Sequence, residues 1–217
     1  FGVSVAVDGT RLLVGAEGGV HGSTPAGAAY LFEYQTDTWV EVQKLVSSDG
    51  GVFDGFGYGV VLDDDMAVVA AIRNDENGSD AGAAYVFRND GKTFVQEAKL
   101  LSSNAAAGDY FGQGLDAEGN RIAVGSTEDD SFASDGGAVY IFEWDGSSWV
   151  ETQRLSDDDP QAGAVFGWDV LVKGDQVIVG APFDTVDDFW GVGSIQVFAF
   201  DGSTWGHSET VYAADNN

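Results

Sequence analysis

The sequence predicts an all-β protein built from four copies of one unit. Phe-Gly begins at residues 1, 56, 111 and 166, so the period is 55 residues throughout. The chain contains 31 glycines but only three prolines, and it is rich in valine, alanine and aromatic residues. Glycine supplies the positive φ angles that tight turns need, and branched or aromatic side chains pack well on pleated sheets. We therefore expect short strands joined by tight turns.

Other landmarks keep the same period. A pair of small residues begins at positions 15, 70, 125 and 180, and segments similar to GAAYLF begin at 27, 82, 137 and 193. The fourth copy carries one extra residue between Ala181 and Gly193, which we assign to a loop. The chain of 217 residues is expected to form a single repeat domain with repeats at 1–55, 56–110, 111–165 and 166–217.

Each repeat is predicted to hold two hairpins. Apolar runs flank Asp8-Gly9, which favours a type I′ turn, and Asp145-Gly146 marks a second turn in the third repeat. The segment 149–155 alternates with a period of two, as expected of a half-exposed strand. Four strands in a unit of about 40 to 55 residues are typical of a β-propeller blade. Four blades form either a closed ring or part of a larger propeller or repeat array, and the pattern favours neither.

The chain resembles the FG-GAP repeat, found in the integrin α-subunit propeller and in bacterial and algal surface proteins. The small pairs Gly15-Ala16, Gly125-Ser126 and Gly180-Ala181, the last followed by Pro182, resemble the GAP segment, whereas Ala70-Ala71 is a looser fit. This resemblance implies a propeller fold and an extracellular or cell-surface location. The FG positions are Phe1, Gly2, Phe56, Gly57, Phe111, Gly112, Phe166 and Gly167.

We interpret the Phe-Gly pairs as structural contacts at the seams between blades. A large aromatic ring buries much apolar area, while the adjacent glycine lets a second backbone approach closely. Replacing a buried phenylalanine with alanine is expected to cost about 3–5 kcal/mol.

The charge of the chain restricts its partners. Thirty-six acidic residues against nine basic ones give a formal charge of −27, which repels nucleic acid and anionic lipid. The sequence contains no cysteine and no apolar stretch of membrane-spanning length. We therefore expect neither a disulfide framework, nucleic-acid binding nor membrane insertion. The acidic surface serves solubility, collects divalent cations, or does both.

The acidic loops of repeats two to four offer oxygen ligands that suit calcium. The calcium loop typical of the FG-GAP family does not fit here, because that segment is a tight hairpin in this chain. Two interpretations stay open: solvated acidic loops, or Ca²⁺ bound in at least one of them. The candidate ligands are Asp75, Asn77 and Asp80; Asp129, Asp130 and Asp135; and Asp184, Asp187 and Asp188.

Aromatic residues in the fourth repeat are the candidates for ligand contact. Phe189 and Trp190 have no counterparts in the other repeats, whereas Trp149 and Trp205 share the position of Trp39 and are expected in the core. Aromatic side chains of this kind anchor protein partners or stack on sugars. We expect them to meet a protein or glycan at a cell surface or matrix.

The sequence contains no recognisable catalytic motif. The two histidines lie at different places in their repeats, and no nucleophile elbow, P-loop or zinc-protease motif is present. We predict a non-catalytic extracellular propeller for adhesion, protein interaction or assembly into surface structures, self-assembly included. The alternative is an accessory propeller of a larger secreted hydrolase or lectin.

Overall fold

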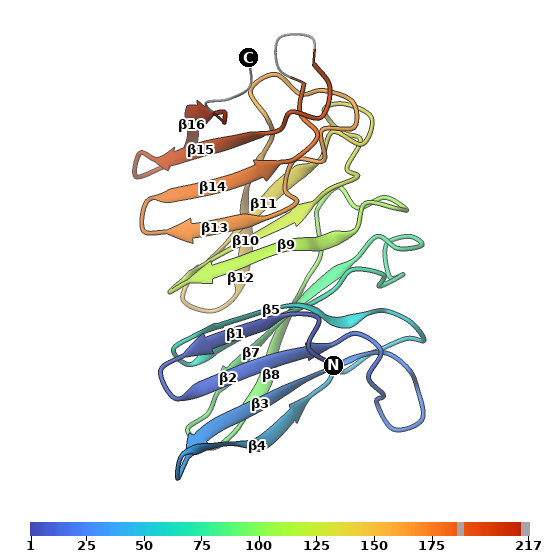
Figure 1. Ribbon diagram of the computed structural model, residues 1–217, viewed down its shortest axis with the longest axis vertical. Coiled ribbons are helices and arrows are strands. Elements are labelled where there is room, and N and C mark those ends of the chain that lie inside the picture. Colours follow the sequence, from blue (N-terminus) through green and yellow to red (C-terminus); the bar gives the residue numbers. More distant parts are fainter. Residues whose placement is uncertain (186–188, 214–217) are drawn as a thin grey trace. The chain divides into compact units, whose positions relative to one another are not determined.

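The structure is a computed structural model that describes residues 1–185 and 189–213. The described residues form four antiparallel sheets of four strands each, and every sheet is a meander in chain order (Figure 1). They include no helix that could span a membrane. The four sheets correspond to the four sequence repeats, which confirms the all-β fold of four-stranded repeats.

Contacts divide the chain into two compact units, Phe1–Ala107 and Gly108–Asn217. The first unit contains β1 (Val5–Asp8), β2 (Arg11–Ala16), β3 (Ala28–Gln35), β4 (Thr38–Leu45), β5 (Phe56–Asp63), β6 (Met66–Ala71), β7 (Ala83–Asn89) and β8 (Phe94–Leu100). The second contains β9 (Phe111–Glu118), β10 (Arg121–Ser126), β11 (Ala138–Trp144), β12 (Trp149–Leu155), β13 (Val170–Lys173), β14 (Gln176–Ala181), β15 (Ser194–Phe200) and β16 (Trp205–Val211). Each unit thus holds two sheets and its own apolar core.

The first hairpin of the first repeat turns one residue later than predicted. Asp8 pairs with Arg11 in the ladder, so the loop consists of Gly9 and Thr10. Gly9 has a φ of 56°, whereas Thr10 is not among the residues with positive φ, so the pair is not a type I′ turn. Asp8 instead closes the hairpin, because its carboxylate accepts a hydrogen bond of 3.0 Å from Arg11.

The second hairpins of repeats two to four are closed by an aspartate. Asp90, Asp145 and Asp201 each accept hydrogen bonds of 2.8–2.9 Å from the backbone amides two and three residues later. These amides lower the pKa of all three carboxyls. The Asp145-Gly146 turn prediction is confirmed, and Gly146 has a φ of 100°.

The Phe-Gly pair at the start of the second and fourth sheets meets the preceding sheet of its unit. Phe56 is fully buried, and its amide donates a 2.9 Å hydrogen bond to the Ala26 carbonyl. Phe166 is equally buried and donates a 2.9 Å hydrogen bond to the Gly136 carbonyl. The Phe56 ring packs edge-on against Tyr85 and Phe87 of its own sheet. These pairs therefore join two sheets, as predicted.

Glycines of the preceding repeat make this contact sterically possible. A Cβ atom on Gly15 would lie 2.0 Å from the Gly57 carbonyl oxygen, and one on Gly27 would lie 2.0 Å from the Phe56 oxygen. In the second unit, a Cβ on Gly125 would lie 2.0 Å from the Gly167 oxygen. Real Cβ atoms do not come this close to backbone, so the seam admits only glycine at these positions.

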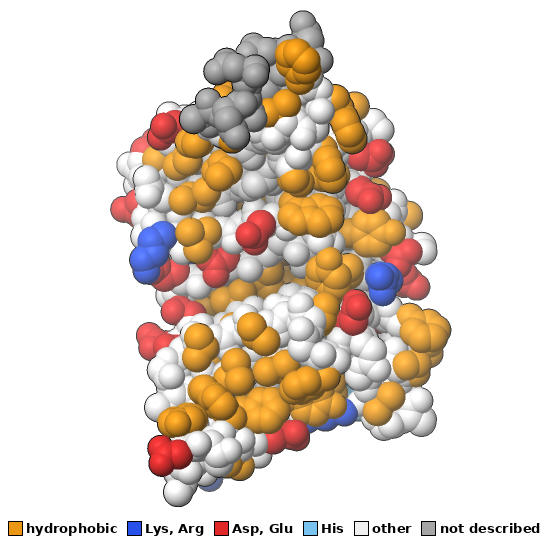
Figure 2. All heavy atoms as spheres, viewed as in Figure 1, with side chains coloured by type: hydrophobic (Ala, Val, Ile, Leu, Met, Phe, Trp, Pro, Cys, Tyr) orange, Lys and Arg blue, Asp and Glu red, His pale blue; other side chains and the backbone are white. Residues whose placement is uncertain are grey.

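Phe1 differs from the other Phe-Gly phenylalanines. Its side chain is 77% exposed, whereas Phe111 is fully buried like Phe56 and Phe166. The centre of the Phe1 ring lies 5.6 Å from that of Tyr30 and 6.1 Å from that of Phe32, both in its own repeat. Hydrophobic side chains also reach the surface over the first sheet (Figure 2). The expected buried seam contact is therefore not formed by Phe1.

A glutamine on the fourth strand fastens the seam in each unit. The Gln43 side chain donates to the Phe94 carbonyl at 2.7 Å and accepts from the Phe94 amide at 2.8 Å. Gln153 holds Trp205 by the same two hydrogen bonds, at 2.6 and 2.7 Å. Trp205 is buried as expected, but Trp149 is only half-buried, and Trp39 is 40% exposed; both lie on the first sheet of their unit.

Gly15→Ala tests whether close backbone approach limits the seam. The added methyl group cannot be accommodated beside the Gly57 carbonyl, so we expect a loss of about 2 kcal/mol or more in the free energy of unfolding. Gly18→Ala is the matched control, because a Cβ there meets no atom within 4 Å. Chemical denaturation of both variants measures the difference. Equal stability of the two variants would contradict this account.

Phe56→Ala and Phe1→Ala compare the stability contributed by a buried seam phenylalanine with that contributed by an exposed one. Phe56→Ala should lower the unfolding free energy by about 3–5 kcal/mol, because it leaves a cavity in a packed core. Phe1→Ala should cost less than about 1 kcal/mol, since most of its ring is already in water. Thermal unfolding of the two variants checks the ranking, and a larger loss for Phe1→Ala would reverse it.

Candidate functional site

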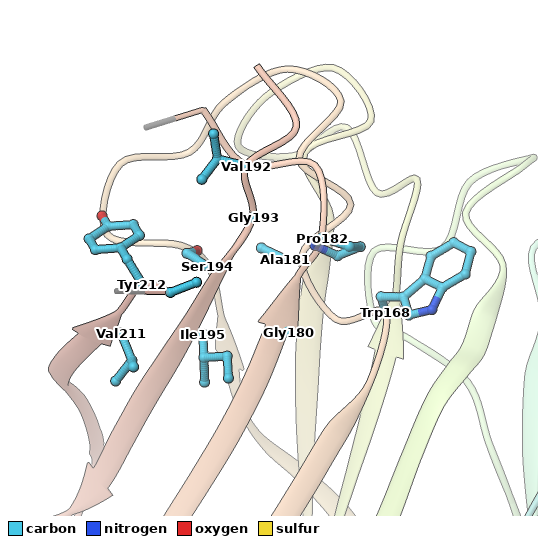
Figure 3. Close-up of a pocket in the computed structure, with 11 residues that line it drawn as sticks. Trp168, Gly180, Ala181, Pro182, Val192, Gly193, Ser194, Ile195, Val211 and Tyr212 are labelled. Atoms are coloured by element: carbon cyan, nitrogen blue, oxygen red, sulfur yellow. The ribbon is translucent and has the colours of Figure 1, made fainter. Parts of the chain in front are cut away.

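An open apolar groove lies at the loop end of the fourth sheet. Its volume is about 540 Å³, and it is formed by the end of β14, the segment leading into β15 and the end of β16. Tyr212 and Trp168 lie at its two ends, with Ala181 and Ser194 between them (Figure 3). Apolar side chains and glycine backbone make up most of its lining. We call this feature the apolar groove.

An exposed row of aromatic rings continues from the groove. The Trp168 ring lies edge-on to Phe183 at 6.4 Å, and Phe183 stacks on Trp190 at 5.7 Å with an angle of 8° between the planes. The exposed fractions are 48% for Trp168 and 70% for Trp190, and that of neighbouring Phe189 is 71%. We call Trp168, Phe183 and Trp190 the aromatic row. Ligand contact by Phe189 and Trp190 stays a prediction.

A second, acidic cavity adjoins the groove in the same unit. Its volume is about 350 Å³, and its lining consists of Asp157, Asp158, Asp159, Gln161, Asp184, Thr185 and Tyr212. Tyr212 lines both the groove and this cavity. A site that spans both would therefore offer an apolar surface directly beside a group of carboxylates. We call this second feature the acidic cavity.

Asp157 is the least satisfied group of the acidic cavity. It is only 4% exposed, and its Oδ1 atom accepts a 3.0 Å hydrogen bond from Gln196. Its Oδ2 atom is buried without a hydrogen-bond partner. Burial raises the pKa of Asp157 to about 6; the Asp159 amide opposes this rise, whereas Asp158 and Asp184 add to it. A buried carboxylate with a free oxygen is ready to accept a donor.

An equivalent cavity of about 340 Å³ lies in the first unit. It is lined by Asp49, Asp54, Asn74 and Glu76 among others, and it contains Lys99 of the same chain. The Lys99 ammonium lies 2.7 Å from Asp49 and 2.5 Å from Glu76. This cavity therefore holds its own positive charge.

The predicted calcium ligands of repeats two and three close their own loops. The Asp75 carboxylate accepts a 2.8 Å hydrogen bond from the Asp80 amide, and Asp130 makes the same 2.8 Å bond with the Asp135 amide. Asp80 and Asp135 have φ angles of 55° and 49°, as required for such tight closure. Asn77 is exposed in the same loop.

The remaining calcium candidates are buried at the base of these loops or lie outside the described residues. Asp129 is fully buried and accepts hydrogen bonds from the Tyr140 hydroxyl and the Ser131 amide. Asp184 is 4% exposed and accepts one from the Thr185 amide. Asp187 and Asp188 lie outside the described residues.

The described carboxylates are thus drawn to loop amides and hydroxyls. Across residues 1–185 and 189–213, no three carboxylate or imidazole side chains are arranged to hold a metal ion. Calcium binding by the full set stays a prediction, since Asp187 and Asp188 belong to it.

Sequence reasoning missed Asp157 and Trp168. Asp157 belongs to an acidic stretch with ordinary turn composition, and only its counterparts Ser47 and Ser102 in other repeats mark it as unusual. Trp168 follows the fourth Phe-Gly, where the first repeat has Val3. A column-by-column comparison of the repeats is the signal that distinguishes both residues.

Asp157→Asn should stabilise the protein near neutral pH. The folded-state pKa of about 6 exceeds the ordinary value of 3.8, so folding loses stability as pH rises between these values. The variant removes a buried charge, and we expect a gain of up to about 3 kcal/mol above pH 6 that disappears below pH 4. Unfolding measured across this range, with exposed Asp159→Asn as control, tests the prediction. A pH-independent difference would contradict it.

The sequence was compared with known proteins. The FG-GAP repeat family matches residues 1–32, 39–87, 94–142 and 149–198, which together cover most of the chain. Each of the last three matches begins at the fourth strand of one sheet and ends in the third strand of the next. No curated protein matches the chain. The last three matches begin 55 residues apart, which is the period of the sheets, and the chain belongs to the FG-GAP repeat family.

Proposed function

We propose that this chain is a non-catalytic, extracellular interaction domain that binds a protein partner through its fourth repeat. The observation that carries the proposal is the apolar groove with the aromatic row beside it. Tryptophan and tyrosine contribute much of the binding energy of protein interfaces, because they bury a large area and lose little conformational entropy. Here Trp168 and Trp190 are exposed at strand ends and in a loop, where a partner can reach them.

The charge of the chain supports a basic partner. The formal charge of −27 attracts cationic surfaces and opposes close approach of another copy of the chain. The acidic cavity brings this charge to the edge of the groove, since Tyr212 lines both. A protein segment with an apolar and a basic side chain close together would match the two features. FG-GAP repeats form β-propeller-type interaction domains, and a role in adhesion at the cell exterior is part of the proposal.

The placement of the histidines supports a role without catalysis. His207 is hydrogen-bonded to Thr210 at 3.0 Å and lies 3.7 Å from Asp158. His21 lies in the first repeat, where its backbone pairs with that of Thr24. These two side chains belong to different units, and neither lines the groove. The groove itself offers tryptophan, tyrosine and aliphatic side chains, which suit binding.

A peptide display selection tests the proposed function without knowledge of the partner. Peptides selected on the wild-type chain should be rich in lysine or arginine beside apolar residues, and they should lose affinity at least about tenfold on Trp190→Ala. Phe189→Ala should also weaken binding. Phe53→Ala is the matched control, because Phe53 is 68% exposed but lies in the first unit.

Two results would reject the proposal. If selected peptides bind Trp190→Ala, Phe189→Ala and the wild type equally well, the aromatic loop is not the binding surface. If no peptide is enriched but a glycan array shows binding that depends on Trp190, the partner is a carbohydrate.

A further inference from the structure

The four sheets differ in charge at one pair of facing residues, one on the third strand and one on the fourth. In the first three sheets, a tyrosine on the third strand is paired in register with a cation on the fourth strand. In the fourth sheet, both members of the pair have changed and no cation is present at this position. The pairs are Tyr30 with Lys44, Tyr85 with Lys99, Tyr140 with Arg154, and Gln196 with Thr210.

The Lys99 pair shows what this cation does in the first unit. Its ammonium bonds Asp49 and Glu76 and lies 5.3 Å from the centre of the Tyr85 ring. Burial opposes the charge of Lys99, but Asp49 and Glu76 outweigh it and raise the lysine pKa. For Asp49, burial acts to raise the pKa, but hydrogen bonds from Lys99 and Tyr85 lower it overall. The cation therefore keeps a partly buried carboxylate ionised.

The acidic cavity of the second unit is the counterpart of this site without the cation. Residues 157–161 correspond to 47–51, so Asp159 is the counterpart of Asp49, and Asp157 is a carboxylate where the first unit has Ser47. Thr210 occupies the place of Lys99, and its hydroxyl donates to Gln196 at 2.9 Å. Gln196 in turn donates to Asp157 Oδ1. This relay positions Asp157 but supplies no positive charge, and Asp157 Oδ2 is left without a donor.

No lysine or arginine is among the described residues that line the acidic cavity. His207 directs Nδ1 toward Asp158 Oδ2 at 3.7 Å, and its Nε2 is engaged with Thr210. The cavity carboxylates of the described residues do not converge as metal ligands. An ammonium or guanidinium group suits the site better, because its N–H donors satisfy separate carboxylate oxygens.

We propose that the acidic cavity receives a lysine or arginine side chain of the partner protein. This side chain takes the place that Lys99 occupies in the first unit and donates to the free oxygen of Asp157. Tyr212 separates the cavity from the apolar groove, so an apolar neighbour of the basic residue lies in the groove. This inference rests on the proposed function and specifies the chemistry of its ligand.

Filling the cavity from within the chain is the first test. Thr210→Lys should place an ammonium in the acidic cavity, as Lys99 does in the cavity of the first unit, and should raise the melting temperature at pH 7. Ser208→Lys is the matched control, because it adds the same charge to an exposed position of the same strand. If Thr210→Lys raises the melting temperature no more than Ser208→Lys, the cavity does not take a cation and the inference is wrong.

Peptide binding is the second test. For a selected peptide, replacing its basic residue with norleucine should weaken binding to the wild type at least about tenfold, as expected for loss of a charged hydrogen bond. The same replacement should have little effect on Asp157→Asn, which lacks the charge, and on Thr210→Lys, which fills the cavity. An equal effect on all three proteins would overturn the inference.

The outcomes separate this inference from the proposed function. Peptides that depend on Trp190 but not on a basic residue would reject the basic ligand and leave the proposed function standing. Failure to select any peptide would reject both, even if Thr210→Lys were stabilising. Stabilisation of the wild type by Ca²⁺, removed by a chelator and absent in Asp157→Asn, would identify a metal occupant and reject the basic side chain.

Discussion

The structure depends on the close approach of two backbones at the seam between sheets. Gly15 and Gly57 meet with no room for a Cβ atom, and Gly125 meets Gly167 in the same way. This contact lets the amide of the next phenylalanine bond the preceding repeat while its ring packs into its own sheet. The Phe-Gly and Gly-Ala motifs are therefore two halves of one contact. Their spacing fixes where each following loop begins.

Side chains reinforce this contact in alternate repeats. Gln43 and Gln153 bond the backbone of the following sheet, whereas the equivalent residue of the second repeat, Ala98, has no amide to do so. Arg11 lies over the Phe94 ring, and Arg121 lies over Trp205. The first and third repeats thus carry the fastening residues. Each unit pairs one such repeat with one that has another residue in place of the glutamine.

Sequence periodicity predicts most of this fold because a residue's place in the repeat determines its neighbours. The prediction is wrong for residues whose surroundings differ from those of their counterparts in other repeats. Phe1 and Trp39 belong to the first repeat of their unit and are exposed. The shift of the first turn has another cause, since Asp8 bonds Arg11 instead of entering the loop. Phe189 and Trp190 could be singled out because they break the repeat, but groove geometry is not encoded in composition.

The role of Asp157 could not be predicted from composition, because it depends on Thr210, a residue more than fifty positions away. An aspartate in a turn is ordinary, and so is a threonine on an exposed strand. Together they are unusual: the first unit has Ser47 in the place of Asp157 and Lys99 in the place of Thr210, so the second cavity has an additional buried carboxylate and lacks the cation. Burying a carboxylate without its cation is costly unless something compensates. The acidic cavity, whose described lining holds carboxylates and no lysine or arginine, is therefore suited to a cation from outside the chain.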